Sequence, residues 1–293
     1  MTYSIVARDP ETGELGVAVQ SCYYQVGPVV PWGQAGVGAV ATQSMVNIAF
    51  GPAGVELMRL GCTAPQALDA VLAGDPLSDS RQCAMVDAAG GVAAHTGAHC
   101  IAEAGHRVGD GYSVQANLME RDTVWDAMAA AFEAAEGPLP ERLLAALDAA
   151  EGEGGDVRGK QSAAMLVLSG TPTGRAWEDR LIDLRVEDHP EPLVELRRLL
   201  RYRRAYQAAA AGGGAAHRKA LRIAPEIVQL RFFAGLALAG EGEWDEAVAL
   251  LREAIASEPR WEQALPRFVP AGRVSSELVA EVQSRLRTEG RPA

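Results

Sequence analysis

The stretch that decides the fold is Met1-Thr-Tyr-Ser-Ile-Val-Ala-Arg-Asp-Pro-Glu-Thr-Gly-Glu-Leu-Gly-Val-Ala-Val19, at the start of the chain. Two short apolar runs, from Tyr3 to Ala7 and from Leu15 to Val19, flank a polar segment in which Asp is followed by Pro and Thr by Gly. Apolar runs of this length predict strands, and these residue pairs are typical of turns. The stretch therefore predicts a β-hairpin.

Outward from the hairpin, strands and pairs of helices alternate. Further strands are predicted at residues 29–31, 36–43, 83–87, 92–95, 112–118, 161–168 and 181–186, and helices at residues 52–60, 63–73, 124–135 and 138–150. The sequence Thr63-Ala-Pro-Gln66 is a capping box, which marks the start of a helix. Because single helices do not alternate with single strands, we expect an α+β fold with mainly antiparallel sheets rather than a doubly wound parallel sheet.

Length, composition and charge fit a folded protein of two domains. The 293 residues are 48% hydrophobic and 22% charged, with a formal net charge of −11. Residues 1–186 carry a net charge of −12 and the remainder +1, so we place a domain boundary between residues 188 and 189. The acidic balance argues against nucleic acid and anionic membranes as partners. We find no leader pattern and no membrane-spanning run, and therefore expect a cytoplasmic protein.

Residues 189–293 are predicted to be helical. The first helix, to about residue 210, carries the arginines Arg197, Arg198, Arg201, Arg203 and Arg204. A later segment resembles one tetratricopeptide unit, through Gly235, Trp244, Ala247, Leu251, Ala254 and Pro259. Arg231 departs from that pattern, and a single unit cannot bury its own face. We expect the tail to pack on the first domain or on a second subunit, and the acidic domain beside an arginine-rich helix predicts a homodimer.

Thr2 is the first candidate catalytic residue. If the initiator methionine is removed, the Thr2 hydroxyl becomes a nucleophile and its own α-amine, with an ordinary pKa of about 8, becomes the base. A retained Met1 would block the amine and leave Thr2 as an ordinary strand residue. Cys22 and Ser162 are alternative nucleophiles.

Several longer stretches resemble one bacterial family. They are residues 1–19, Val29-Val-Pro-Trp32, residues 36–43, Ala93-Ala-His-Thr-Gly97, Gln115-Ala-Asn117 and residues 155–163. Together they resemble the family called domain of unknown function 1028, over roughly residues 1–189. The resemblance implies an N-terminal-nucleophile hydrolase-like fold, which is a four-layer αββα sandwich with the nucleophile on its first strand, and it implies amide-bond hydrolysis. Family members often carry a peptidoglycan-binding tail, which the tetratricopeptide-like unit replaces here.

Other polar residues complete the predicted site. Asn117, Gln115 and Gln43 can donate hydrogen bonds to an oxyanion, and Lys160 can lower the pKa of the α-amine or stabilise negative charge. We take Thr2, Lys160 and Asn117 as catalytic and predict a substrate-binding set of Ser4, Gln43, His95, Thr96, Gln115, Asp156, Gln161 and Ser162. Asp156 has an alternative role in a salt-bridged turn with Arg158 or Lys160, and His95 has a structural one.

No metal or cofactor is expected. His95 and His99 have no convincing carboxylate partner, and the glycine-rich motifs that bind nucleotide phosphates are missing from the sequence. The leading hypothesis is a hydrolase that cleaves a C–N bond in a small amide, lactam or ureido compound. The alternative is a non-catalytic binding or assembly protein that acts through its helical tail.

Overall fold

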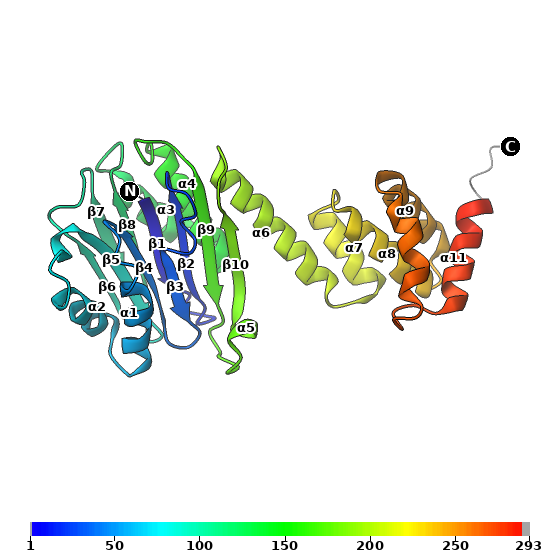
Figure 1. The fold of residues 1–293 in the computed structure, drawn as a ribbon, viewed down its shortest axis with the longest axis horizontal. Coiled ribbons are helices and arrows are strands. Elements are labelled where there is room, and N and C mark those ends of the chain that lie inside the picture. Colours follow the sequence, from blue (N-terminus) through cyan, green and yellow to red (C-terminus); the bar gives the residue numbers. More distant parts are fainter. Residues whose placement is uncertain (1, 289–293) are drawn as a thin grey trace. The chain divides into compact units, whose positions relative to one another are not determined.

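Two antiparallel β-sheets with their helices make up the first part of the chain, and a helical segment follows them (Figure 1). The computed structural model describes residues 2–288. The chain divides into two compact units, residues 1–198 and 199–293, and helix α6 (Pro192–Ala209) runs through the division. Our expected boundary after residue 188 falls just before that helix begins.

The first sheet contains the N-terminal hairpin. Its strand order is β10 (Arg180–Val186), β9 (Ser162–Leu168), β2 (Leu15–Ser21), β1 (Thr2–Arg8), β8 (Tyr112–Asn117) and β7 (Gly105–Gly109). The predicted turn forms because the Asp9 carboxylate accepts a hydrogen bond of 2.8 Å from the Thr12 amide and Gly13 adopts a φ of 71°. In the central strand β1, Thr2 lies opposite Asn117.

The second sheet has four strands in the order β3 (Pro31–Gln34), β4 (Gly38–Ser44), β5 (Arg81–Asp87) and β6 (Val92–Thr96). Strand β3 begins where the predicted strand at residues 29–31 ends. Helices α1 (Phe50–Arg59) and α2 (Ala64–Ala73) pack on this sheet, where Phe50, Met58 and Leu68 share a core with Val40 and Met85. The predicted capping box of Thr63 and Gln66 begins α2.

The two sheets face each other. Val6, Val17 and Val19 of the first sheet share an apolar core with Ala41 and Val86 of the second. On the other side of the first sheet, the Tyr3 hydroxyl donates a hydrogen bond to Glu151 of α4 (Leu139–Gly152), which packs beside α3 (Val124–Ala134). Because successive side chains of a strand point to opposite faces, Thr2 and Ser4 point toward the second sheet.

The remaining helices are α5 (Ala176–Asp179) in the first unit and, in the second, α7 (Gly213–Ile223), α8 (Val228–Gly240), α9 (Trp244–Ser257), α10 (Arg260–Ala264) and α11 (Ser276–Thr288). Helices α8 and α9 approach closely at Gly235, where a β-carbon would lie 2.6 Å from Leu251. The Phe232 ring stacks on Trp261 at 4.6 Å. Within residues 2–288, each helix is too short or too polar to cross a bilayer.

Candidate active site around Thr2

Thr2 lies at the wall of a small cavity of about 50 Å³. The other lining residues are Tyr23, Val26, Val29, Val30, Gln43, Ser44 and Val46. Only 4% of Thr2 is exposed, and its hydroxyl donates a hydrogen bond of 3.0 Å to the Ser21 hydroxyl. The residue that the sequence predicts as the nucleophile therefore has an oriented hydroxyl beside a space that can hold a reacting group.

A buried network of amide side chains holds the backbone of Thr2. The Thr2 carbonyl oxygen accepts hydrogen bonds of 3.3 Å from the side-chain nitrogens of Gln43 and Asn117. The same two nitrogens donate to the Gln82 side-chain oxygen at 2.7 and 2.8 Å. Gln82 and Gln43 belong to the second sheet and Asn117 to the first, so the network joins the two sheets beneath Thr2.

Ser4 and Gln115 extend this network along the strands. The Ser4 hydroxyl donates to the Gln43 side-chain oxygen at 2.7 Å and accepts from the Gln115 side-chain nitrogen at 2.5 Å. The Ser113 hydroxyl donates to the Gln115 side-chain oxygen at 3.0 Å. These residues are at most 1% exposed, so the interior between the two sheets is polar near Thr2 and apolar farther along.

The side chain of Asn117 has one unpaired atom. Both hydrogens of its nitrogen are used, by the Thr2 carbonyl and by Gln82. Its oxygen is buried and has no hydrogen-bond partner among the described residues. In this arrangement Asn117 therefore presents an acceptor beside Thr2, whereas the oxyanion role that we predicted for it requires a free donor. An unpaired buried acceptor is costly, which favours a donor group bound there.

Thr96 connects the network to a second cavity. The Gln82 side-chain nitrogen donates to the Thr96 hydroxyl at 2.9 Å, and that hydroxyl lies 2.8 Å from Nδ1 of His106. Thr96 and His106 line a cavity of about 500 Å³ together with Cys100 and Trp125. Burial, and to a smaller degree the nearby His95, lowers the pKa of His106. Thr96 thus joins the predicted site to a histidine that the sequence analysis did not select.

Lys160 makes its contacts with carboxylates. Its ammonium group lies 2.7 Å from Glu191 and 3.2 Å from Glu151, and these bonds, the one to Glu191 first, raise its pKa. Glu151 is also the partner of Tyr3, whose side chain points away from the second sheet. The contacts of Lys160 are therefore with residues outside the amide network.

Asp156 forms the salt-bridged turn that was the alternative interpretation. Its carboxylate lies 2.7 Å from the Arg158 guanidinium and accepts a hydrogen bond of 3.2 Å from the backbone of Cys22. The Cys22 thiol donates to the Arg158 carbonyl oxygen at 3.6 Å. The turn is thus hydrogen-bonded to Cys22, the residue that follows β2. Asp156 therefore helps to hold the segment that leads to Tyr23 in the cavity lining.

The other predicted site residues, Ser162, Gln161 and His95, form hydrogen bonds with other residues of the chain. Ser162 donates to the Tyr23 carbonyl oxygen at 2.5 Å and accepts from the Val26 amide at 3.1 Å, so it fixes one wall of the Thr2 cavity. The Gln161 side chain donates to Asp188 at 3.2 Å, and His95 lies 2.9 Å from the Ser78 carbonyl oxygen. These contacts leave Thr2, Ser4, Gln43, Thr96, Gln115 and Asn117 as the predicted residues that the network brings together.

The sequence analysis missed Gln82, Ser21 and His106. Gln82 was lost because the predicted strand began at Cys83, whereas β5 begins at Arg81. Alternation along β5 places Gln82 on the same face as Ala84 and Val86, which the sequence could have shown. Ser21 ends the second strand of the hairpin and required its register with β1, which no local pattern gives.

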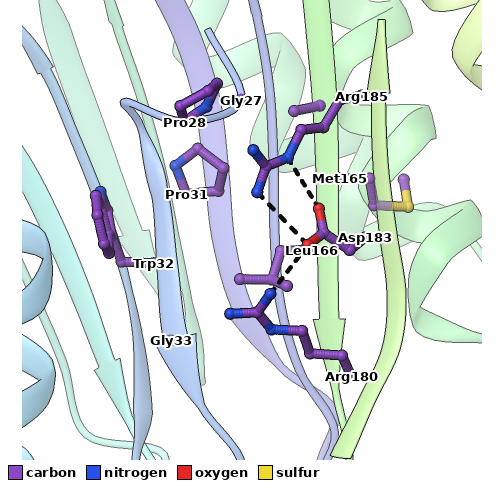
Figure 2. A pocket seen from close by; sticks show the side chains of 11 residues that line it. Gly27, Pro28, Pro31, Trp32, Gly33, Met165, Leu166, Arg180, Asp183 and Arg185 are labelled. Atoms are coloured by element: carbon purple, nitrogen blue, oxygen red, sulfur yellow. Dashed lines mark hydrogen bonds and ion pairs between the residues drawn. The ribbon is translucent and has the colours of Figure 1, made fainter. Parts of the chain in front are cut away.

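A third cavity, of about 100 Å³, lies between β3 and the strands β9 and β10 (Figure 2). Figure 2 shows Asp183 between Arg180 and Arg185, with distances of 3.3 and 3.0 Å between the charged groups. The cavity shares no lining residue with the one at Thr2. Within residues 2–288, no group of three or more His, Cys, Asp or Glu side chains is placed to hold a metal ion.

Comparison with known proteins finds a matching family model and similar solved structures. The model of a family described as "Family of unknown function (DUF1028)" matches residues 2–196. A crystal structure of a protein from Silicibacter pomeroyi, assigned to the same family, is 33% identical with a TM-score of 0.62, covering 72% of this chain and 90% of that one. The ancestral β-subunit Anbu from Yersinia bercovieri aligns at 13% identity with a TM-score of 0.34, covering 67% of this chain and 92% of that one, which is too weak to carry an argument. No curated protein matches.

Proposed function

Because the chain belongs to the DUF1028 family over residues 2–196, we propose that its first unit is an N-terminal-nucleophile hydrolase with Thr2 as nucleophile. The reaction is cleavage of a C–N bond in a small amide, lactam or ureido compound. The observation that carries the proposal is the position of Thr2, which lines a cavity and whose hydroxyl is oriented by a hydrogen bond to Ser21.

The packing of helices on the sheets supports the fold that this reaction class uses. Helices α1 and α2 lie on the second sheet, and α3 and α4 on the first, while the remaining faces of the two sheets pack together. We assign this arrangement to the four-layer αββα sandwich. In the tail, the close approach of α8 and α9 at Gly235 supports a tetratricopeptide-like helix pair.

Thr2 itself provides both the nucleophile and the base of the proposed reaction. The α-amine accepts the hydroxyl proton while Oγ1 attacks the substrate carbonyl carbon, which gives a tetrahedral intermediate. When that intermediate collapses, the C–N bond breaks and the ammonium group returns the proton to the leaving nitrogen. Water, activated by the same amine, then hydrolyses the acyl ester and releases a carboxylic acid.

The neighbours of Thr2 have positioning roles in this scheme. Ser21 orients the hydroxyl, and the Asn117 side-chain oxygen is the acceptor available for the α-ammonium group. Gln43 and Asn117 hold the Thr2 carbonyl, which fixes the direction of the strand end. Lys160 forms ion pairs with Glu151 and Glu191. In this scheme it offsets the negative charge of Glu151, the partner of Tyr3, and does not contact the substrate.

The test begins with the intact mass and N-terminal sequence of the purified protein. We expect the chain to begin at Thr2, and we expect Thr2→Ala to abolish hydrolysis in a screen of small amides. Cys22→Ala is the matched control, because its thiol donates to the Arg158 carbonyl oxygen, outside the amide network, and the variant should keep full activity. A protein that retains Met1, or activity lost in Cys22→Ala and kept in Thr2→Ala, would refute the Thr2 mechanism.

A second function is favoured by an apolar cavity of about 750 Å³ in the helical tail. Phe233, Leu236, Phe268, Val274 and Leu278 line it. Such a cavity is suited to an apolar partner segment, as the binding or assembly alternative requires.

A homodimer remains our proposal for the assembly, and a single monomeric species in sedimentation at micromolar concentration would exclude it.

A further inference from the structure

We propose that the Thr2 cavity selects substrates whose acyl group is uncharged and apolar. This inference rests on the proposed function, because it concerns the substrate of the same site. The cavity is lined by Thr2, Gln43 and Ser44, by Tyr23, and by the four valines Val26, Val29, Val30 and Val46. No Asp, Glu, Lys, Arg or His belongs to this described lining, so apart from the reacting α-amino group of Thr2 a charged substrate group would meet no counter-ion there.

The polar and apolar lining residues favour one orientation of the substrate. The carbonyl that reacts must lie at the Thr2 hydroxyl, where the amide of Gln43 is also found. The substituent on that carbonyl then points toward the valines, which offer dispersion and apolar burial but no hydrogen bonds. A carboxylate or ammonium group in the same place loses its hydration without compensation.

Both chain segments that supply the apolar lining residues are held in place by hydrogen bonds. Ser162 fixes the segment that carries Tyr23 and Val26, as described above. The loop that carries Val46 is fixed at its ends, where Arg81 donates to the Met45 carbonyl oxygen and Asn47 donates to Asp75 at 2.9 Å. The cavity is therefore formed before a substrate arrives, and its chemistry is set by residues that cannot easily move away.

The apolar character continues outside the cavity. Tyr23 is 52% exposed and Met45, beside the lining residues Ser44 and Val46, is 59% exposed. Large apolar side chains that remain exposed next to a cavity mark a surface suited to an apolar ligand. This rim extends the same preference to the part of the substrate that remains at the cavity mouth.

The first experiment measures binding, with two probes that differ only in the acyl group. Isobutyryl p-nitroanilide is uncharged, and succinyl p-nitroanilide carries a carboxylate. We expect the isobutyryl probe to bind about tenfold more tightly or better, and to shift the backbone amide NMR signals of Tyr23, Val26 and Val46. Equal or tighter binding of the succinyl probe, or binding of neither, would overturn the inference.

The second experiment reverses the selectivity. Val46 is half-buried in a loop, so Val46→Arg places a cation at the cavity without disturbing a strand. We expect this variant to bind the succinyl probe at least as well as the isobutyryl probe. Val108→Arg is the matched control. Val108 is 48% exposed on β7 and does not line the cavity, so this substitution adds the same charge at a different site. A preference for the isobutyryl probe that is unchanged in Val46→Arg would contradict our placement of the acyl group.

Release of p-nitroaniline separates the two proposals. If the isobutyryl probe binds as expected but is not cleaved by a protein that begins at Thr2, the apolar selectivity holds and the hydrolase proposal fails. If both probes are cleaved at equal rates and bind equally well, hydrolysis stands and the selectivity fails.

Discussion

Asp75 is the residue that anchors the loop beside the Thr2 cavity. Its carboxylate accepts hydrogen bonds from Arg81, from Asn47 at 2.9 Å and from the Leu77 amide at 2.8 Å. These bonds, the one from Arg81 first, lower the pKa of Asp75 to about 2. Arg81 also donates to the Met45 carbonyl oxygen. Through Arg81 and Asn47, the Asp75 carboxylate therefore positions the loop on both sides of Val46.

Removing the charge of Asp75 should loosen that loop and change the pH dependence of stability. A carboxyl whose pKa is lower in the folded state stabilises the fold above its unfolded pKa of about 4, and this contribution is lost as the pH falls toward about 2. We therefore expect Asp75→Asn to lower the melting temperature at pH 7 and to reduce the difference between variant and wild type at pH 3. Thermal unfolding followed by circular dichroism at both pH values measures this. A deficit of Asp75→Asn that is the same at pH 3 as at pH 7 would contradict the proposed role.

At the scale of elements, Gln82 of β5 is the central member of the amide network. Its oxygen accepts from Gln43 and Asn117, and its nitrogen donates to Thr96. Gln82→Leu leaves buried donors without partners, and we expect it to lower the free energy of unfolding by about 2 kcal/mol or more. Gln161→Leu is the control, because that side chain makes an exposed hydrogen bond to Asp188 and its loss should change stability by less than about 0.5 kcal/mol. Urea unfolding of both variants checks the difference, and equal stabilities would show that the network contributes nothing.

The contact of α1 with β3 depends on one glycine. A β-carbon at Gly51 would lie 2.2 Å from the Trp32 ring, whose nitrogen donates to the Val29 carbonyl oxygen at 2.9 Å. The ring cannot move without breaking that bond, so we expect Gly51→Ala to destabilise the protein by about 1–3 kcal/mol.

The matched control is Gly152→Ala at the end of α4. A β-carbon at Gly152 would have no atom within 4 Å, and alanine favours the helix by up to about 1 kcal/mol. We therefore expect Gly152→Ala to be neutral or stabilising in the same urea titration. A Gly51→Ala variant as stable as Gly152→Ala would refute the close packing of α1 on Trp32.

The helices and most strands were predictable because their patterns are local. The capping box at Thr63 and the apolar spacing of residues 124–135 need no knowledge of distant residues, and α2 and α3 form as expected. Strand β7 was missed because Gly105–Gly109 is half-exposed and has no apolar alternation. Its strand conformation comes from pairing with β8, which is a tertiary effect.

The candidate site could be predicted only in part for the same reason. Thr2, Ser4, Gln115 and Asn117 were found because strand alternation and family resemblance place them together. Lys160 looked suitable by its charge, but its partners are Glu151 at the end of α4 and Glu191 just before α6, and no local pattern reveals this pairing. Residue type gives a candidate's chemistry, whereas its partners depend on how distant strands and helices meet.

At the scale of the whole molecule, the chain consists of two compact units, residues 1–198 and 199–293. Each has its own apolar core, that of the second unit being centred on Phe232, Leu238 and Leu251. We expect each unit to open independently, because the buried contacts that resist opening lie within it.

A glycine in α8 allows this independence to be tested. At Gly235, a β-carbon would lie 2.6 Å from Leu251 and 3.0 Å from the Ala247 carbonyl oxygen, whereas at Gly240 it would meet no atom within 4 Å. We expect Gly235→Ala to speed amide hydrogen exchange in α8 and α9 and to leave the two sheets unchanged, and Gly240→Ala to have little effect. Faster exchange of β1 and β8 in Gly235→Ala would show that the units are coupled.

The amide network has a consequence for the lifetime of the folded protein. The bonds from Asn117 to Gln82, from Ser4 to Gln43 and from Gln43 to the Thr2 carbonyl join strands of different sheets. They can form only after the sheets have met, and we expect this step to follow the folding transition state. Interactions absent from the folding transition state determine how fast a protein unfolds and not how fast it folds. The Gln82→Leu variant should therefore refold at nearly the wild-type rate and unfold faster than the wild type. The network would then slow the unfolding step that separates the two sheets.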